Sequence, residues 1–208
     1  MSRLTFARPS PFRQIRSKVI IACEGEKTEP LYFNAIRTHL HASAKDIVIV
    51  DHKGTDPLTI VQSAVDEVAR HKPWLKGDTA WAVFDGDEHR QTAAQKHNWD
   101  RALALAAARH IHVLISNPSF EFWYLLHFKP QAANLHRAAA LTSLRAYLLN
   151  YDKGVSVFAV LNGLPPPLGR GPASDRAAAL RAMHARNCLP TWTNPSTEVD
   201  VLVAKLLG

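Results

Sequence analysis

The chain has 208 residues, of which 47% are hydrophobic and 21% are charged, and its formal net charge is +7. This composition is typical of a folded globular protein and excludes an intrinsically disordered chain. Only two cysteines are present, Cys23 and Cys188, so no disulfide framework is expected and a reducing cytoplasm is the predicted location. No apolar run approaches the roughly 20 residues that span a bilayer, so no membrane partner is expected.

The first 18 residues carry much of the positive charge and no acidic residue. The basic side chains are Arg3, Arg8, Arg13, Arg16 and Lys18. They interrupt the apolar core that a signal peptide would need. We expect residues 1–16 to form an irregular basic arm. Lys and Arg displace counterions from phosphates, so the arm either contacts nucleic acid through its four arginines or only keeps the chain soluble.

Four short apolar runs alternate with helical patterns over the first 116 residues. Strands are predicted at residues 17–23, 47–50, 79–84 and 112–116, and helices at 28–39, 56–70 and 92–109. Thr28 is the expected N-cap of the first helix, and Thr55 or Asp56 that of the second. Alternation of strands and helices with crossovers of this length predicts a parallel sheet with helices on both faces.

The sequence beyond residue 116 predicts mainly helices. Asn117 and Pro118 are the expected N-cap and first residue of a helix that runs to about Phe128. Further helices are predicted at 138–149, 173–187 and 197–206, and residues 155–160 fit either a short strand or a helix.

Carboxylates follow two of the predicted strands. Glu24 comes after the first strand, and Asp85 and Asp87 come at the end of the third. The carboxyl ends of parallel strands form the ligand-binding edge of such a sheet, and oxygen ligands suit Mg²⁺ or Mn²⁺. Asp85 and Asp87 are two residues apart, so their side chains share one side of the strand and repel each other unless a cation lies between them. The pattern predicts a metal site for phosphate chemistry, although Asp-Gly-Asp is also common in turns.

Two further glutamates have open interpretations. Glu29 either joins the metal site or simply favours the positive N-terminus of its helix. Glu121 lies in the most apolar predicted helix, where a lone carboxylate costs several kcal/mol unless it is paired or metal-bound. A ligand or base and a structural ion pair are therefore the two alternatives for Glu121. Because its helix is predicted to begin at a strand's carboxyl end, we expect Glu121 to face the same cleft as Asp85.

Several motifs together resemble the RloB-like family. The matching runs are residues 20–33 (IIACEGEKTEPLYF), 117–128 (NPSFEFWYLLHF), 151–153 (YDK) and 194–199 (NPSTEV), so the resemblance extends over about residues 18–205. RloB-like proteins are similar to the Toprim superfamily, which places a metal-binding Glu after the first strand and Asp-x-Asp after the third. Glu24, Asp85 and Asp87 match those positions. The resemblance also makes Glu26 or Glu29 a candidate additional metal ligand.

The resemblance implies an α/β fold with a Toprim-like four-stranded parallel sheet flanked by helices. It divides the chain into the basic arm (1–16), a Toprim-like catalytic domain (17–130) and a helical C-terminal extension packed on that domain (131–208). The implied activity is a Mg²⁺- or Mn²⁺-dependent nuclease that hydrolyses phosphodiester bonds in DNA or RNA, in bacterial phage defence. A defence-system ATPase or another protein is a possible partner. The alternative is a nucleic-acid-binding or sensor subunit with a vestigial metal site that acts with a partner protein.

In the nuclease interpretation each candidate residue has a role. The metal ligands are Glu24, Asp85, Asp87 and Glu29, and Glu121 and Lys27 complete the catalytic set. The arm arginines and Lys153 position the nucleic-acid backbone.

Overall fold

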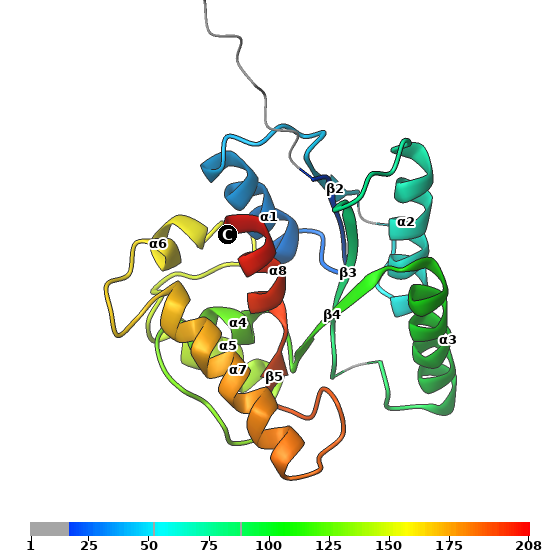
Figure 1. The fold of residues 1–208 in the computed structure, drawn as a ribbon. Helices are drawn as coiled ribbons and strands as arrows, with labels where there is room; N and C mark the ends of the chain where they lie inside the picture. Colours follow the sequence, from blue (N-terminus) through cyan, green and yellow to red (C-terminus); the bar gives the residue numbers. More distant parts are fainter. Residues whose placement is uncertain (1–16, 52, 88) are drawn as a thin grey trace, which may run out of the picture.

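The structure is a computed structural model that describes residues 17–51, 53–87 and 89–208 (Figure 1). The predicted basic arm, with Arg3, Arg8, Arg13 and Arg16, lies outside the described residues. The strands are β1 (Val19–Cys23), β2 (Ile47–Val50), β3 (Thr79–Asp85), β4 (His112–Asn117) and β5 (Ser196–Thr197). The helices are α1 (Thr28–His39), α2 (Pro57–Arg70), α3 (Ala93–Arg109), α4 (Glu121–Leu126), α5 (Arg137–Arg145), α6 (Phe158–Asn162), α7 (Arg170–Arg186) and α8 (Val199–Leu207).

The strands form one sheet in the order β2-β1-β3-β4-β5. β1 pairs in parallel with β2 and β3, and β3 pairs in parallel with β4. The last strand runs antiparallel to β4, with Ser196 opposite Asn117 and Thr197 opposite Ser116. The α/β class is therefore confirmed, but the sheet is five-stranded and mixed rather than the expected four-stranded parallel sheet. β5 has two residues, which is too short to leave a periodic pattern in the sequence.

Helices cover both faces of the sheet. α2 and α3 pack on one face, while α1 and α4 to α8 gather on the other (Figure 1). Alternate residues of β1 enter the two cores: Ile20 packs with the α2 and α3 side chains, and Ile21 packs with those of α1 and α4. The second core also contains Leu144 of α5 and Leu202 of α8, so the C-terminal helices share it with the sheet. None of the described helices has both the length and the apolarity needed to cross a membrane.

Helix starts depend on local capping in some places and on tertiary contacts in others. Asp56 caps α2 as predicted, because its side chain accepts a hydrogen bond from the Thr59 amide at 3.1 Å. Thr28 is not an N-cap: Lys27 occupies that position without a side-chain hydrogen bond, and Thr28 is the first residue of α1. Residues 155–160 contain the start of a helix, α6, rather than a strand.

The predicted N-cap role of Asn117 is wrong. Asn117 ends β4, and α4 begins only at Glu121. The physical reason is that the Asn117 side chain is engaged elsewhere, since its amide donates to the Trp192 carbonyl at 2.8 Å and its oxygen accepts from Asn194 at 3.1 Å. Tertiary hydrogen bonds therefore take the place of the local cap.

We expect the Asp56→Ala variant to lose about 1 kcal/mol of folding free energy, the usual effect of removing an N-cap. Asp56 also accepts a hydrogen bond from Asn98 of α3 at 3.0 Å, which ties two helices of one layer together. Thermal unfolding should show a midpoint lowered by about 2–4 °C. Asp100→Ala, at an exposed position of α3, is the matched control and should change the midpoint little. Equal midpoints for the two variants would contradict the capping role.

Candidate functional site

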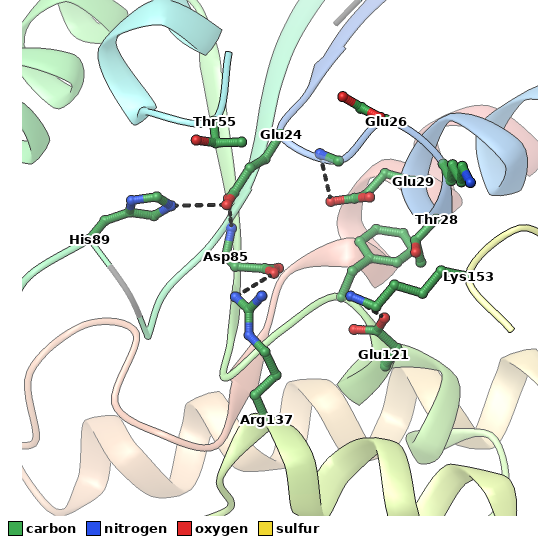
Figure 2. A pocket seen from close by; sticks show the side chains of 13 residues that line it. Glu24, Glu26, Thr28, Glu29, Thr55, Asp85, His89, Glu121, Arg137 and Lys153 are labelled. Atoms are coloured by element: carbon green, nitrogen blue, oxygen red, sulfur yellow. Dashed lines mark hydrogen bonds and ion pairs between the residues drawn. The ribbon is translucent and has the colours of Figure 1, made fainter.

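A pocket of about 410 Å³ opens where β1 and β3 end (Figure 2). Five acidic side chains line it, namely Glu24, Glu26, Glu29, Asp85 and Glu121. They come from the end of β1, from α1, from β3 and from the start of α4. Basic residues also line it: Lys27, His89, Arg137 and Lys153. The carboxyl edge of the parallel strands thus collects charges of both signs in one cavity.

Glu24 connects the ends of two neighbouring strands. Its amide continues the β-ladder by donating to the Val83 carbonyl at 2.9 Å. Its carboxylate Oε2 accepts from the Asp85 amide at 2.7 Å, and His89 Nε2 lies 3.1 Å from Oε1. The Glu24 carboxylate is therefore held against the end of β3, next to Asp85.

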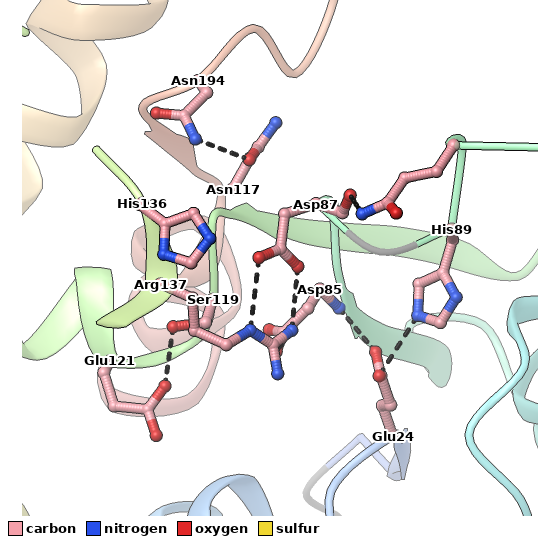
Figure 3. Close-up of polar contacts among 12 residues, drawn as sticks. Glu24, Asp85, Asp87, His89, Asn117, Ser119, Glu121, His136, Arg137 and Asn194 are labelled. Carbon is pink, nitrogen blue, oxygen red and sulfur yellow. Dashed lines mark hydrogen bonds and ion pairs between the residues drawn. The ribbon is translucent and has the colours of Figure 1, made fainter. Parts of the chain in front are cut away.

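Asp85 and Asp87 share a single guanidinium. Arg137 Nη2 donates to Asp85 Oδ2 at 2.9 Å and to Asp87 Oδ1 at 2.8 Å, and Arg137 Nε donates to Asp87 Oδ2 at 3.2 Å (Figure 3). The two aspartates thus reach one cation from the same side of the chain. Asp87 lies at the edge of the pocket rather than in its lining.

Two glycines permit the close approaches at this edge. A Cβ atom at Gly25 would collide with the carboxylate of Glu29. A Cβ atom at Gly86 would lie 2.9 Å from the Cβ atom of Asn117. Gly86 is therefore required by packing against β4, whereas a side chain at position 25 would force the Glu29 carboxylate to move.

Glu29 is the second residue of α1 and is only 4% exposed. Its Oε1 accepts from the Gly25 amide at 3.3 Å. Burial, together with the nearby charges of Glu24 and Glu121, raises the pKa of Glu29 to about 7. Burial also raises the pKa of Asp85 well above its ordinary value, with further contributions from Glu29 and Glu24, and Arg137 opposes this rise only in part. The acidic groups are therefore both buried and close enough to repel one another.

Glu121 lines the same pocket as Asp85 and is 3% exposed. Its Oε2 accepts a hydrogen bond from the Ser119 hydroxyl at 2.7 Å. Its Oε1 makes no hydrogen bond within the part of the chain that the structure describes, and the Lys153 ammonium lies 3.2 Å from it. The Lys153 side chain is half exposed, so it neutralises Glu121 from the mouth of the pocket.

An aromatic cluster fixes α1 against α4 and so fixes the two buried glutamates. Trp123 Nε1 donates to the Tyr32 hydroxyl at 2.9 Å, and the Tyr124 hydroxyl donates to the Thr28 carbonyl at 3.3 Å. The rings of Tyr32 and Phe120 meet edge to face with centroids 5.7 Å apart. The apolar run around Glu121 thus forms the support that holds this carboxylate beside Glu29.

Some of the candidate residues lie at the mouth of the pocket, and others are not among the residues that the structure describes. Glu26 and Lys27 are exposed at the mouth of the pocket. Neither side chain is buried. By contrast, the buried side chains of Glu24, Glu29, Asp85 and Glu121 line one pocket. The four arginines of the arm cannot be placed, since they precede the first described residue.

Sequence patterns miss three residues that shape this site: His89, Arg137 and Asn194. Arg137 is the first residue of α5, far along the chain from the aspartates that it binds. Asn194 accepts from the Leu135 amide and donates to the Leu135 carbonyl, both at 2.9 Å, and thereby anchors the chain two residues before Arg137. Asn194 belongs to one of the motifs that resemble the RloB-like family, which is the only sequence signal among the three.

The donor set fits a hard divalent cation. Carboxylate oxygens are the main candidate metal ligands in the pocket, and these carboxylates repel one another. In addition, the buried Glu121 Oε1 lacks a hydrogen bond within the described residues. Among those residues, no three Asp, Glu, His or Cys side chains are already gathered as a metal-binding group. Arg137 occupies the oxygens of Asp85 and Asp87 instead. By position, Glu24, Asp85 and Asp87 would hold the metal, with Glu29 as a further oxygen donor.

Together these features define an α/β protein with an acidic pocket at the carboxyl edge of its parallel strands. The chain belongs to the RloB-like protein family, because the family's sequence model matches residues 19–206, nearly the whole length. The resemblance noted from the motifs is thereby confirmed. No curated protein and no solved structure matched the chain.

We expect Glu29→Gln to remove a pH-dependent loss of stability. Unfolded Glu29 loses its proton near its ordinary pKa of 4.5, whereas folded Glu29 keeps it until about pH 7, so wild-type stability falls as the pH rises between these values. The two proteins should be equally stable near pH 4 and below, where Glu29 is largely protonated in both the folded and the unfolded state. Near pH 8, without divalent ions, the variant should be the more stable by roughly 2–3 kcal/mol. Urea unfolding across this range measures the difference, and a constant difference would rule out the raised pKa.

Proposed function

We propose that the protein is a metal-dependent nuclease that hydrolyses phosphodiester bonds in DNA or RNA, with Mg²⁺ or Mn²⁺ as its cofactor. The observation that carries the proposal is the burial of Glu24, Glu29, Asp85 and Glu121 in one pocket, where burial and, to a lesser extent, mutual repulsion raise the pKa of Glu29 and Asp85. The acidic groups lie deeper than the cations, since the Lys153 side chain is 50% exposed and that of Arg137 is 27% exposed. Such a group of carboxylates suits a cation that brings a phosphate with it.

The roles of the residues follow from their positions. Glu24, Asp85 and Asp87 would hold the metal, which when bound would neutralise charge on the phosphate and activate water. Glu29 has a pKa of about 7, which suits a group that accepts or returns a proton at neutral pH. Lys27 and Lys153 line the mouth of the pocket, where they would bind the phosphates on either side of the reacting bond.

The proposal also covers the fold type, the biological role, the cellular location and the partner. The parallel strands in the order β2-β1-β3-β4, with Glu24 after β1 and the Asp85–Asp87 pair at β3, support a Toprim-type catalytic fold. Family membership and the motif resemblance support a role in bacterial phage defence, in the cytoplasm, beside a partner such as a defence-system ATPase.

A second candidate function is a nucleic-acid-binding or sensor subunit whose metal site is vestigial. One observation favours it: Arg137 already forms ion pairs with Asp85 and Asp87, so a cation is present at the pair without a metal. The two functions differ in whether the protein cleaves the nucleic-acid backbone when a divalent metal is supplied.

We expect the purified protein to cleave at least one of four substrates, single- or double-stranded DNA or RNA, when Mg²⁺ or Mn²⁺ is present. Cleavage should stop on addition of EDTA. Glu24→Gln, Asp85→Asn and Glu121→Gln should each lower the rate 100-fold or more, because each removes a charge from the pocket. Asp100→Asn, an exposed change on α3, should cleave at the wild-type rate.

Gel electrophoresis of end-labelled substrates measures these rates, and a circular dichroism melt shows that each variant is folded. Metal-independent retardation of nucleic acid without cleavage of any substrate would favour the sensor subunit instead. Loss of stability without loss of activity in Glu121→Gln would assign Glu121 to a structural ion pair with Lys153.

We expect deletion of residues 1–16 to weaken nucleic-acid binding and to reduce its dependence on salt. The segment contains Arg3, Arg8, Arg13 and Arg16, and each phosphate that one of them contacts adds close to one to the slope of log K against log salt. Removal of the segment should therefore lower the slope by up to about 4. A full-length variant with four Arg→Gln changes separates charge from length and should match the deletion. Unchanged affinity at moderate salt would exclude the arm from binding.

A further inference from the structure

Arg137 holds the oxygens that the proposed metal would need. Its guanidinium donates to Asp85 Oδ2, Asp87 Oδ1 and Asp87 Oδ2. Figure 3 shows the side chain reaching from α5 into the space between the two aspartates. An arginine side chain is protonated at neutral pH, so a fixed positive charge balances part of the negative charge of these two carboxylates.

The polypeptide is anchored so that Arg137 reaches this position. Asn194 bonds to both backbone groups of Leu135, and it also donates to the side chain of Asn117 at the end of β4. The anchor therefore connects the start of α5 to the strand that neighbours β3. The guanidinium is placed by this anchor rather than by a flexible surface loop.

A divalent cation bound to these oxygens would lie close to the guanidinium, and two positive charges at short range in a partly buried pocket repel each other. A bidentate arginine–aspartate pair is among the stronger ion pairs in proteins. Metal binding therefore has to break part of it, and the apparent metal affinity is lowered by the free energy of the contacts that are lost.

We propose that Arg137 is the resident counter-ion of the Asp85–Asp87 pair, and that it sets the metal affinity of the site by competing with the divalent cation for these oxygens. The inference rests on the proposed function, since it assumes that this pair binds the metal. In the absence of metal, Arg137 binds both aspartates and offsets part of their negative charge. When metal binds, the guanidinium leaves at least one of them.

The test is a calorimetric titration with Mn²⁺ alone at low ionic strength. Arg137→Gln should bind Mn²⁺ at least tenfold more tightly than the wild type, because the competing charge is gone. Arg137→Lys keeps the charge but lacks the planar fork, so it should show a smaller gain of a few-fold. Arg101→Gln removes the same charge from an exposed position on α3 and should bind as the wild type does. The double variant Arg137→Gln/Asp85→Asn should not show the tighter Mn²⁺ binding expected of Arg137→Gln alone.

A second measurement follows the guanidinium directly. The ¹⁵N resonance of Arg137 Nε, identified by its absence in Arg137→Lys, should shift when Mg²⁺ is added to the wild type. Melting curves show whether Arg137→Gln is folded. If that variant is unfolded, the Mn²⁺ affinity of Arg137→Lys is compared with that of the wild type instead.

The outcomes separate the inference from the proposed function. If the wild type binds Mn²⁺ and the Arg137 variants bind it equally or more weakly, Arg137 is not a competitor and the inference fails, while the metal site stands. If neither the wild type nor any variant binds Mn²⁺, the proposed function and the inference fail together.

Discussion

Repulsion among buried carboxylates at the ends of β1 and β3 is the constraint on which the rest of the site depends. Glu24, Glu29 and Asp85 lie in one pocket, and burial alone would disfavour their ionised forms. The fold reduces the repulsion in distinct ways. A backbone amide satisfies an oxygen of Glu24, a guanidinium binds Asp85, and Glu29 has its pKa raised to about 7. Each of these devices acts on one carboxylate, so the pocket combines ionised acids, a titrating glutamate and basic side chains in one cavity.

The C-terminal third of the chain is part of this electrostatic arrangement. Arg137 and Lys153 provide positive charge to carboxylates that are carried by the first 121 residues. The same third includes Asn194, which anchors the start of α5. The site therefore requires residues from both sides of the predicted boundary at residue 130. The core on the face that contains α1 and α4 also includes side chains of α5 to α8, so it too crosses that boundary.

The parts of the molecule that could be predicted from sequence are those with local causes. The first four strands have short apolar runs, Asp56 has a capping pattern, and Glu24 and Asp85 follow from strand ends. The parts that could not be predicted have tertiary causes. β5 is two residues long, and Arg137 is separated from Asp85 by 52 residues. The Asn117 error has the same origin, since its side chain satisfies distant backbone and amide groups rather than the helix that follows it.

A purely structural role would explain this pocket poorly. Ion pairs that serve stability alone can often be replaced by apolar side chains without loss, because burial of charge is itself unfavourable. The structure nevertheless keeps Glu29 and Asp85 buried with raised pKa values, and it leaves Glu121 Oε1 without a hydrogen bond in the described part of the chain. Perturbed groups that gather in a cleft are characteristic of sites that bind or react with a ligand. The aromatic cluster of α1 and α4 packs directly beside these groups, so favourable apolar burial next to the pocket offsets the unfavourable burial of charge within it.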